Sequence, residues 1–306
     1  MRQLCSKAFD EIKITKTEAD FLQKATIPQS QCLTWYEHRK GRITASFFHD
    51  VSRHMRGSRC YPTSIVKRIM QYYGSSENVP ALKWGREKED EARQDYISHM
   101  SVKHVDFVVR PCGLVVDPKY PYLGASPDGF VSCSCCGCGL LEIKCPFKFR
   151  DHSPTAEELL SDPSYCLKRN TVGEIHLSMS HKYYCQVQGQ IVMCDSKHCD
   201  FVCWTTKGII IDRIGRDDRF ISDILPDLKL FFTNYVLPEL LSHNLESDPA
   251  ACKKDEKLYC VCHQPESDQI IACDNPTCSI EWFHFQCVGL KRAPHGKWYC
   301  SNCGHC

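Results

Sequence analysis

Two carboxylates and a lysine occur along the chain in a pattern that suits metal-assisted hydrolysis. Asp128 belongs to residues 126–129 (SPDG), and fourteen residues after it comes Glu142, followed by Ile143 and Lys144. In a β-strand, residues two apart point to the same face, so Glu142 and Lys144 would project together while Ile143 packs into the core. With Asp128 at the end of a neighbouring strand, the carboxylates would hold a hard cation, Mg²⁺ or Mn²⁺, that polarises a phosphate and activates a water.

This pattern has an ordinary alternative, because charged residues that alternate along a strand usually form a solvated face. A helix predicted over residues 81–100 favours the metal site. One stripe of this helix, from Leu82 to Tyr96, is apolar except for Glu89. A carboxylate on an apolar stripe is costly to bury unless it has a partner such as a metal. The other acids lie off the stripe and are predicted surface groups: Glu87, Asp90 and Glu91.

Helices and strands are mixed along the part of the chain that must position these residues. The apolar patterns predict extended segments over residues 105–116, 122–131, 140–145 and 201–214. They predict further helices over residues 181–194 and 219–241, the second interrupted at Pro226 and Pro238. Elements in this order predict an α/β or α+β core with one central sheet.

Five ordered motifs resemble lambda exonuclease and the YqaJ-type viral recombinase nucleases. They are residues 35–46 (WYEHRKGRITAS), 84–92 (WGREKEDEA), 126–129 (SPDG), 141–146 (LEIKCP) and 183–188 (YYCQVQ). The resemblance covers about residues 30–240. It implies a restriction-endonuclease-like PD-(D/E)xK core that digests one strand of duplex DNA from a free 5′ end, with a trimeric ring as a possible assembly.

The resemblance also implies roles for individual residues. The metal ligands would be Glu89, Asp128 and Glu142. Lys144 would be the catalytic lysine, and the amide of Gln186 would support the active site. A pocket for the terminal 5′-phosphate would consist of Arg39, Ser46 and Ser126. An arginine fork with hydroxyl donors is chemically suited to a terminal phosphate. The alternative for Arg39 is a plain surface arginine.

A cysteine-rich stretch between Asp128 and Glu142 departs from the pattern of the bacteriophage enzyme. Its thiols are Cys133, Cys135, Cys136 and Cys138. Such closely spaced cysteines are too cramped for easy tetrahedral closure around zinc by themselves. We favour a hairpin tip without metal, or a site that takes ligands from elsewhere, such as Cys112 or His104. A second group of possible metal ligands is Cys194, His198, Cys199 and Cys203. Buried free cysteines, without a metal, are the commoner explanation for such a group.

The cysteine content, 23 of 306 residues, suits either a disulfide scaffold or metal sites. Residues 1–16 carry charges of both signs without an apolar signal segment, and no apolar run of about 18 residues could span a membrane. We therefore expect a soluble intracellular protein with reduced thiols and no membrane partner. Because 38 Lys and Arg nearly balance 37 Asp and Glu, any DNA contact must come from a local patch.

The C-terminal tail contains metal ligands in a spacing that strongly indicates zinc. We predict a nuclease domain over residues 1–241, a polar linker over 242–257 and a zinc finger over 258–306. So small a domain needs its metals in order to fold. The ligand order resembles PHD fingers, and Trp298 favours PHD over RING. Cross-bracing would place one Zn²⁺ on Cys260, Cys262, His284 and Cys287, and the other on Cys273, Cys278, Cys300 and Cys303.

Among PHD fingers, residues 273–275 (CDN), 280–285 (IEWFHF) and 296–300 (GKWYC) resemble the Inhibitor-of-Growth subfamily. This implies binding of the histone H3 N-terminal tail carrying trimethyl-lysine. The cage would consist of Tyr259, Ile270 and Trp282, and a tail arginine would pair with Asp274 or Glu281. The subfamily usually has methionine at the position of Ile270. The alternative for Trp282 is a packing aromatic.

Taken together, these patterns favour a nuclear, Mg²⁺-dependent DNA exonuclease joined to a histone-reading PHD finger, of viral or mobile-element origin. A catalytically inactive DNA- or chromatin-binding adaptor is the main alternative, although all four catalytic positions are intact. An endonuclease with the same core is another. A ubiquitin ligase is disfavoured by Trp298.

Overall fold

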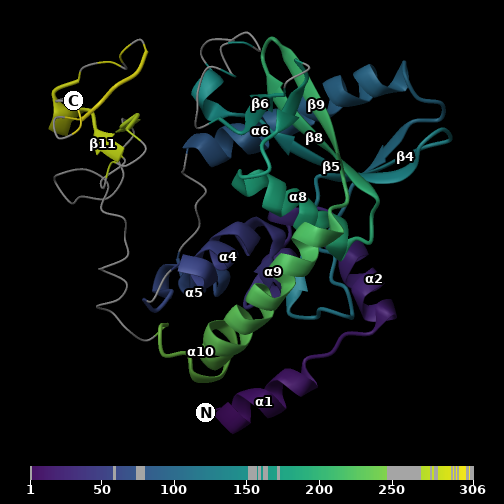
Figure 1. The fold of residues 1–306 in the computed structure, drawn as a ribbon, viewed down its shortest axis with the longest axis vertical. Coiled ribbons are helices and arrows are strands. Elements are labelled where there is room, and N and C mark those ends of the chain that lie inside the picture. Colours follow the sequence, from purple (N-terminus) through teal and green to yellow (C-terminus); the bar gives the residue numbers. More distant parts are fainter. Residues whose placement is uncertain are drawn as a thin grey trace. The chain divides into compact units, whose positions relative to one another are not determined.

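The chain divides into two compact units, Met1–His243 and Asn244–Cys306 (Figure 1). The computed structural model describes residues 2–57, 60–73, 80–150, 157, 160, 165–170, 173–246, 270–275, 278, 282–290, 292, 294, 296–300 and 303. The predicted linker over 242–257 therefore lies largely outside the described residues. No helix among the described residues combines the length and the apolar character needed to cross a bilayer.

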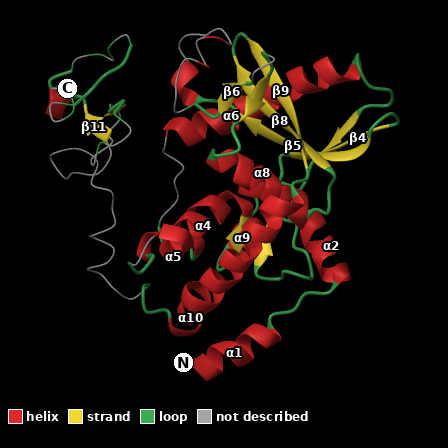
Figure 2. Ribbon diagram, viewed as in Figure 1, coloured by secondary structure: helices red, strands yellow, loops and turns green. Residues whose placement is uncertain are grey.

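A five-stranded mixed sheet forms the centre of the first unit, in the order β2-β4-β5-β8-β9 (Figure 2). Its strands are β2 (Val108–Arg110), β4 (Gly129–Cys133), β5 (Gly137–Lys144), β8 (His198–Thr205) and β9 (Gly208–Gly215). The β5–β8 pair is parallel and the other pairs are antiparallel. A parallel pair needs a crossover connection, and helix α8 (Lys182–Met193) lies within it.

The two faces of the sheet are covered by different helices. Helix α6 (Pro80–Ser101) packs through Ala92 and Tyr96 on the face that presents Leu141 and Ile143 of β5. Helix α8 packs on the face that presents the alternate β5 residue Leu140. Glu142 and Lys144 follow Leu140 at spacings of two and so share the α8 face. The predicted fold class, an α/β or α+β core with one central sheet, is confirmed.

The hairpin of β4 and β5 places the sequence motifs 126–129 and 141–146 beside each other. Gly129 pairs with Leu141 and Cys133 with Gly137. The Asp128 N–H continues this ladder by donating to the Leu141 carbonyl at 2.9 Å. The tight turn closes at Gly137, whose φ of 79° lies in the left-handed region that favours glycine.

The N-terminal part of the first unit is helical, which the sequence patterns did not predict. Its helices are α1 (Arg2–Glu11), α2 (Lys16–Ala25), η1 (Gln29–Gln31), α3 (Leu33–Arg39), η2 (Ala45–Phe47), α4 (Phe48–Gly57) and α5 (Thr63–Ile69). A capping box between Thr15 and Glu18 begins α2. Strand β1 (Ile43–Thr44) pairs in parallel with β3 (Leu123–Gly124), which brings α3 and η2 to the segment that precedes β4. The remaining short elements are η3 (Phe147–Phe149), β6 (Leu167–Arg169) and β7 (Ile175–Leu177).

The last helical segment differs from the prediction. Helix α9 (Asp218–Phe231) continues through Pro226, so the predicted interruption there is wrong. The missing N–H of Pro226 costs one helical hydrogen bond, but the helix buries an apolar face that includes Leu228 and Phe231. The regular helix ends instead at a π-helical turn, η4 (Phe232–Val236), before Pro238 in the first turn of α10 (Leu237–Ser242).

Two predicted extended segments also divide. Residues 122–131 form β3 and the beginning of β4. Residues 201–214 form a hairpin of β8 and β9, whose turn at residues 206–207 closes at Gly208, with a φ of 144°.

The second unit contains a small antiparallel ladder of β10 (Ile270–Ala272) and β11 (Trp282–His284), followed by η5 (Gln286–Val288). Phe283 is almost completely buried, and its ring contacts that of Trp298 at 5.4 Å between centroids. Cys278 and Cys300 are buried in the same cluster. The described core of this unit is therefore a few aromatic rings beside cysteine thiols.

Candidate active site

Glu142 is the most buried acid of the candidate site, with 2% of its surface exposed. Its Oε1 accepts hydrogen bonds from Lys144 Nζ and Gln186 Nε2, both at 2.5 Å. Its Oε2 accepts one from Gln190 Nε2 at 2.6 Å. A buried carboxylate is tolerated when charged or polar donors satisfy it in this way. Sequence reasoning missed Gln190, which stands one helical turn after Gln186.

Asp128 and Glu89 are held beside Glu142 by different elements. The Ile143 N–H of β5 donates to Asp128 Oδ2 at 2.6 Å. On α6, Arg93 Nη2 donates to Glu89 at 2.6 Å, and Arg93 Nη1 donates to the Asp128 carbonyl oxygen. Arg93, which the sequence motifs did not single out, thus links the helix that carries Glu89 to the backbone that carries Asp128.

The site raises the affinity of Asp128 and Glu89 for protons. Burial raises the pKa of Asp128 well above its ordinary value, and repulsion from Glu142 and Glu89 raises it further. Burial also raises the pKa of Glu89, although Arg93 opposes the shift. Burial disfavours the charge of Lys144, but Glu142 and Asp128 outweigh it and raise its pKa above the ordinary value. Like charges that converge in this way fit a hard divalent cation, and the lysine remains an ammonium.

A cavity of about 450 Å³ opens onto these groups. Its lining includes Gly85 and Glu89 of α6, Asp128, Lys144 and Tyr183. The predicted α6 stripe therefore has two parts: its C-terminal half is buried in the core, whereas its N-terminal half, including the exposed Leu82, lines the cavity. Glu89 stands where the two parts meet. The predicted surface acids Glu87, Asp90 and Glu91 are exposed.

The model of the YqaJ-like viral recombinase domain matches residues 34–197, more than half of the chain. The chain belongs to this family. Its structure is similar to that of an alkaline exonuclease, LHK-Exo, from Laribacter hongkongensis. The TM-score is 0.50 and the identity 26%, over 68% of this chain and 94% of the bacterial protein.

In this YqaJ-family chain, the residues predicted to bind a 5′-phosphate are connected through Trp35 and Thr44. The Arg39 guanidinium lies 3.9 Å above the Trp35 ring, and Trp35 Nε1 donates to Ser126 Oγ at 2.9 Å. Arg39 Nη2 lies 3.4 Å from Thr44 Oγ1, which in turn lies 3.1 Å from Ser46 Oγ. Burial lowers the pKa of Arg39 to about 10, so it stays charged at neutral pH. The structure thus brings Arg39, Ser46 and Ser126 into one group. Ser126 stands two positions before Asp128 in the sequence.

The zinc finger of the YqaJ-family chain is described only in part. The ligand atoms of one predicted set, Cys273, Cys278, Cys300 and Cys303, all lie within 4.8 Å of one another. Of the other predicted set, Cys260 and Cys262 lie outside the described residues, as does the side chain of His284, while Cys287 is exposed.

Of the residues predicted to bind the histone peptide, the structure describes Trp282 and Asp274. Tyr259, Glu281 and the side chain of Ile270 lie outside the described part. Trp282 is half-buried at the start of β11. Asp274 accepts a hydrogen bond from the Trp298 N–H at 2.8 Å and returns one from its own N–H to the Trp298 carbonyl. One carboxylate oxygen of Asp274 is therefore used within the finger.

The chain is also similar, over a short region, to Inhibitor of growth proteins. Inhibitor of growth protein 4 of Gallus gallus is 49% identical over 74 residues, and that of Mus musculus is 59% identical over 49 residues. These matches cover 23% and 16% of this chain. The chain spans less than a third of each relative, 30% and 20% of their lengths. The predicted combination of a YqaJ-type nuclease domain with an Inhibitor-of-Growth-like PHD finger is confirmed.

Proposed function

We propose that the chain is a Mg²⁺-dependent exonuclease that hydrolyses one strand of linear duplex DNA from its 5′ end. The observation that carries this proposal is the convergence of Glu89, Asp128 and Glu142 around Lys144, beside a cavity that Glu89, Asp128 and Lys144 line. Similarity to an alkaline exonuclease supports the reaction class. The trimeric ring and the viral or mobile-element origin rest on the resemblance alone.

The chain's own side chains divide the work in this proposal. Mg²⁺ or Mn²⁺ on the carboxylates would polarise the scissile phosphate and lower the pKa of a bound water. Gln186 and Gln190 hold Glu142 in place from α8, and Arg93 holds Glu89. Lys144, kept protonated by its acidic neighbours, places positive charge where negative charge develops.

A pocket for the terminal phosphate would select the end of the strand. Arg39, with Ser46 and Ser126, would bind a 5′-phosphate through its guanidinium fork. Because Ser126 is two residues from Asp128, a phosphate bound there would bring a nearby phosphodiester bond to the metal ligands. This arrangement would make digestion start at an end.

A digestion assay tests the nuclease proposal directly. We expect the full chain with Mg²⁺ to degrade 5′-phosphorylated linear duplex from the 5′ end, to leave covalently closed circles intact, and to stop when EDTA is added. Equal cleavage of circles would show an endonuclease instead. Failure to cut either substrate with Mg²⁺ or Mn²⁺ would favour the inactive adaptor.

We also propose that the PHD finger binds a histone H3 tail carrying trimethyl-lysine and that the protein acts in the nucleus. Similarity to Inhibitor of growth proteins supports this, and so does the position of Trp282, which is not fully buried. A quaternary ammonium is attracted to an aromatic face. The finger would thereby bring the nuclease to chromatin.

Trp282→Ala should weaken the binding of a trimethylated H3-tail peptide about tenfold, because the loss of one cation–π contact costs about 0.5–2 kcal/mol. Titration of trimethylated and unmodified peptides against the full chain, with zinc content measured in parallel, checks this. Trp298→Ala is the contrasting variant, since Trp298 packs against buried Phe283 and should be needed for the fold. If Trp282→Ala also loses zinc, or if the wild type does not prefer the methylated peptide, the cage assignment is wrong.

A further inference from the structure

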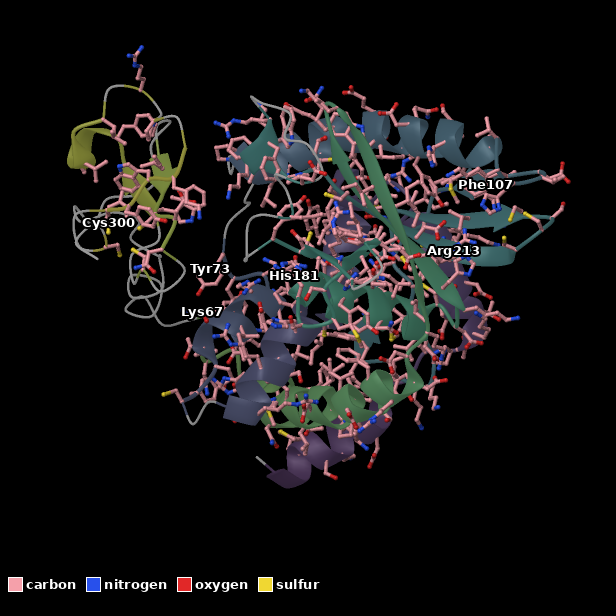
Figure 3. All side chains as sticks on the ribbon, turned by 45° about the horizontal axis from the view of Figure 1, so that its top comes forward. Lys67, Tyr73, Phe107, His181, Arg213 and Cys300 are labelled. Atoms are coloured by element: carbon pink, nitrogen blue, oxygen red, sulfur yellow. The ribbon has the colours of Figure 1, made fainter. Side chains whose placement is uncertain are left out.

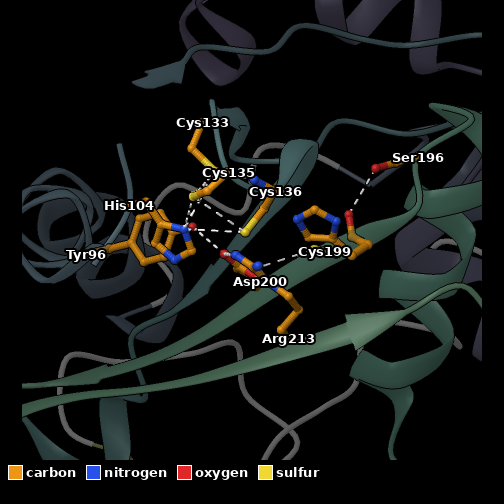
Figure 4. A network of polar contacts seen from close by, with 10 residues as sticks. Tyr96, His104, Cys133, Cys135, Cys136, Ser196, Cys199, Asp200 and Arg213 are labelled. Carbon is orange, nitrogen blue, oxygen red and sulfur yellow. Dashed lines mark hydrogen bonds and ion pairs between the residues drawn. The ribbon is translucent and has the colours of Figure 1, made fainter. Parts of the chain in front are cut away.

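A histidine and three cysteines converge at the tip of the β4–β5 hairpin (Figure 4). The turn lies at the opposite end of the two strands from Asp128 and Glu142. Cys133 ends β4, Cys135 and Cys136 lie in the turn, and His104 comes from the loop between α6 and β2. Their ligand atoms all lie within 4.8 Å of one another. Of the two outside ligands that the sequence suggested, Cys112 is not in this group. It is buried, with its thiol donating to the Gly113 carbonyl.

The distances in this group are close to those of a zinc coordination sphere. With Zn–S bonds of about 2.3 Å and Zn–N bonds of about 2.0–2.1 Å, a tetrahedron has S···S edges of about 3.8 Å and S···N edges of about 3.6 Å. The Sγ atoms of Cys135 and Cys133 are 3.4 Å apart, and those of Cys136 and Cys135 are 3.8 Å apart. His104 Nδ1 lies 3.1 Å from the Sγ of Cys135, 3.6 Å from that of Cys133 and 3.5 Å from that of Cys136.

Hydrogen bonds from the backbone and from Ser134 fix the turn without any help from a metal. The Ser134 N–H donates to the Val105 carbonyl at 2.9 Å, and Ser134 Oγ donates to Asp106 Oδ2 at 2.7 Å. These two bonds tie the hairpin to the loop that carries His104. The Cys136 N–H donates to Cys133 Sγ at 3.2 Å, which holds the chain folded back on its first thiol. The ligands are thus brought together at little further entropic cost.

A cation also stands beside the group. Three thiolates and a neutral imidazole leave one net negative charge on a bound Zn²⁺. The guanidinium of Arg213 on β9 interacts electrostatically with the Cys136 side chain. The same guanidinium is fixed by buried Asp200, at 2.7 Å through Nε and 3.0 Å through Nη2. A positive charge held in this position would stabilise an anionic zinc–thiolate centre.

We propose that His104, Cys133, Cys135 and Cys136 bind a structural zinc ion, separate from the PHD finger and from the carboxylate site. Soft thiolates select zinc over Mg²⁺, and four protein ligands leave no open position for catalysis. Figure 3 shows His181, which lines the catalytic cavity, well apart from Phe107 and Arg213, which flank the cysteine group. The ion would join the β4–β5 hairpin to the loop after α6.

Alkylation of the wild-type chain tests the site without any variant. Cys135, Cys136 and Cys138 are all exposed, but Cys138 is outside the metal-binding group. In the full chain purified in the presence of zinc, we expect iodoacetamide to modify Cys138 quickly. The three ligand cysteines should react at least tenfold more slowly. A strong chelator should remove that protection. Equal reactivity of all four thiols before chelation would overturn the proposal.

Zinc content of variants gives an independent test. His104→Ala and Cys135→Ser should each lose about one zinc ion per chain relative to the wild type, measured by elemental analysis together with protein mass. Cys138→Ser is the matched control and should lose none. A disulfide within the turn is the competing explanation: it would lower the intact mass by about 2 Da and leave zinc unchanged in His104→Ala. Either that result or equal zinc loss in Cys138→Ser would refute the site.

Discussion

Glu142→Gln is expected to abolish Mg²⁺-dependent digestion of linear duplex DNA, with a loss of at least about a thousandfold, while the protein stays folded. The amide has the shape of the carboxylate but not its charge, and metal-assisted charge stabilisation is worth several kcal/mol, of which about 4 corresponds to a thousandfold. Rates should be measured on 5′-phosphorylated duplex at saturating Mg²⁺, and folding checked by thermal melting. Lys144→Ala should have a similar effect on the rate.

The surroundings of Glu142 explain why the amide should be tolerated. A glutamine there would turn its NH₂ group toward a neighbouring donor. Gln190 can resolve this by flipping its own amide, because its buried Oε1 has no hydrogen-bond partner among the described residues. Asp90→Asn is the matched control, since Asp90 stands next to Glu89 in sequence but its side chain is 97% exposed. The catalytic assignment fails if Glu142→Gln keeps near-wild-type turnover, or if Asp90→Asn is equally inactive.

Arg39→Ala is expected to remove the preference for a 5′-phosphorylated end over a 5′-hydroxyl end. A charge-assisted hydrogen bond is worth about 1.5–3 kcal/mol, so the wild type should prefer the phosphate by about tenfold to a hundredfold. The ratio of initial rates on two duplexes that differ only at the 5′ end measures this. Digestion of the hydroxyl end should change little, because the metal ligands are untouched.

Two variants separate the pocket from a general effect of charge. Lys40→Ala removes a positive charge from the neighbouring exposed residue and should leave the preference intact. Arg39→Lys keeps the charge but loses the fork and the stacking on Trp35, so an intermediate ratio is expected. Equal rates on both ends in the wild type, or an effect of Lys40→Ala as large as that of Arg39→Ala, would remove Arg39 from the pocket.

The residues that follow a local period could be predicted from the sequence. A period of two placed Glu142 and Lys144 on one face of β5, and a helical period placed Glu89 within an otherwise apolar stripe of α6. The same logic could have found Gln190 and Arg93, since each stands four residues after a predicted site residue on the same helix. The signal that was missed is a second polar side chain one helical turn after each predicted site residue.

Contacts between distant segments could not be derived in this way. His104 meets Cys133 although 29 positions separate them, because the loop after α6 folds against the β4–β5 turn. Trp35 meets Ser126 across 91 positions, through the parallel pairing of β1 with β3 that places α3 beside that segment. The course of α9 through Pro226 depends likewise on burial of one apolar face, which outweighs a local helix-breaking preference.

The register of the β4–β5 hairpin has a consequence for finding related enzymes in genomes. Backbone pairing of Gly129 with Leu141 sets the distance between Asp128 and Glu142, whereas the residues of the turn lie at the opposite end of both strands. Insertions or deletions at that turn can therefore change the number of positions between the two acids without moving either one. A sequence search that demands a fixed gap would miss such homologues. A better signature keeps the proline before the aspartate and the lysine two positions after the glutamate, and lets the gap vary.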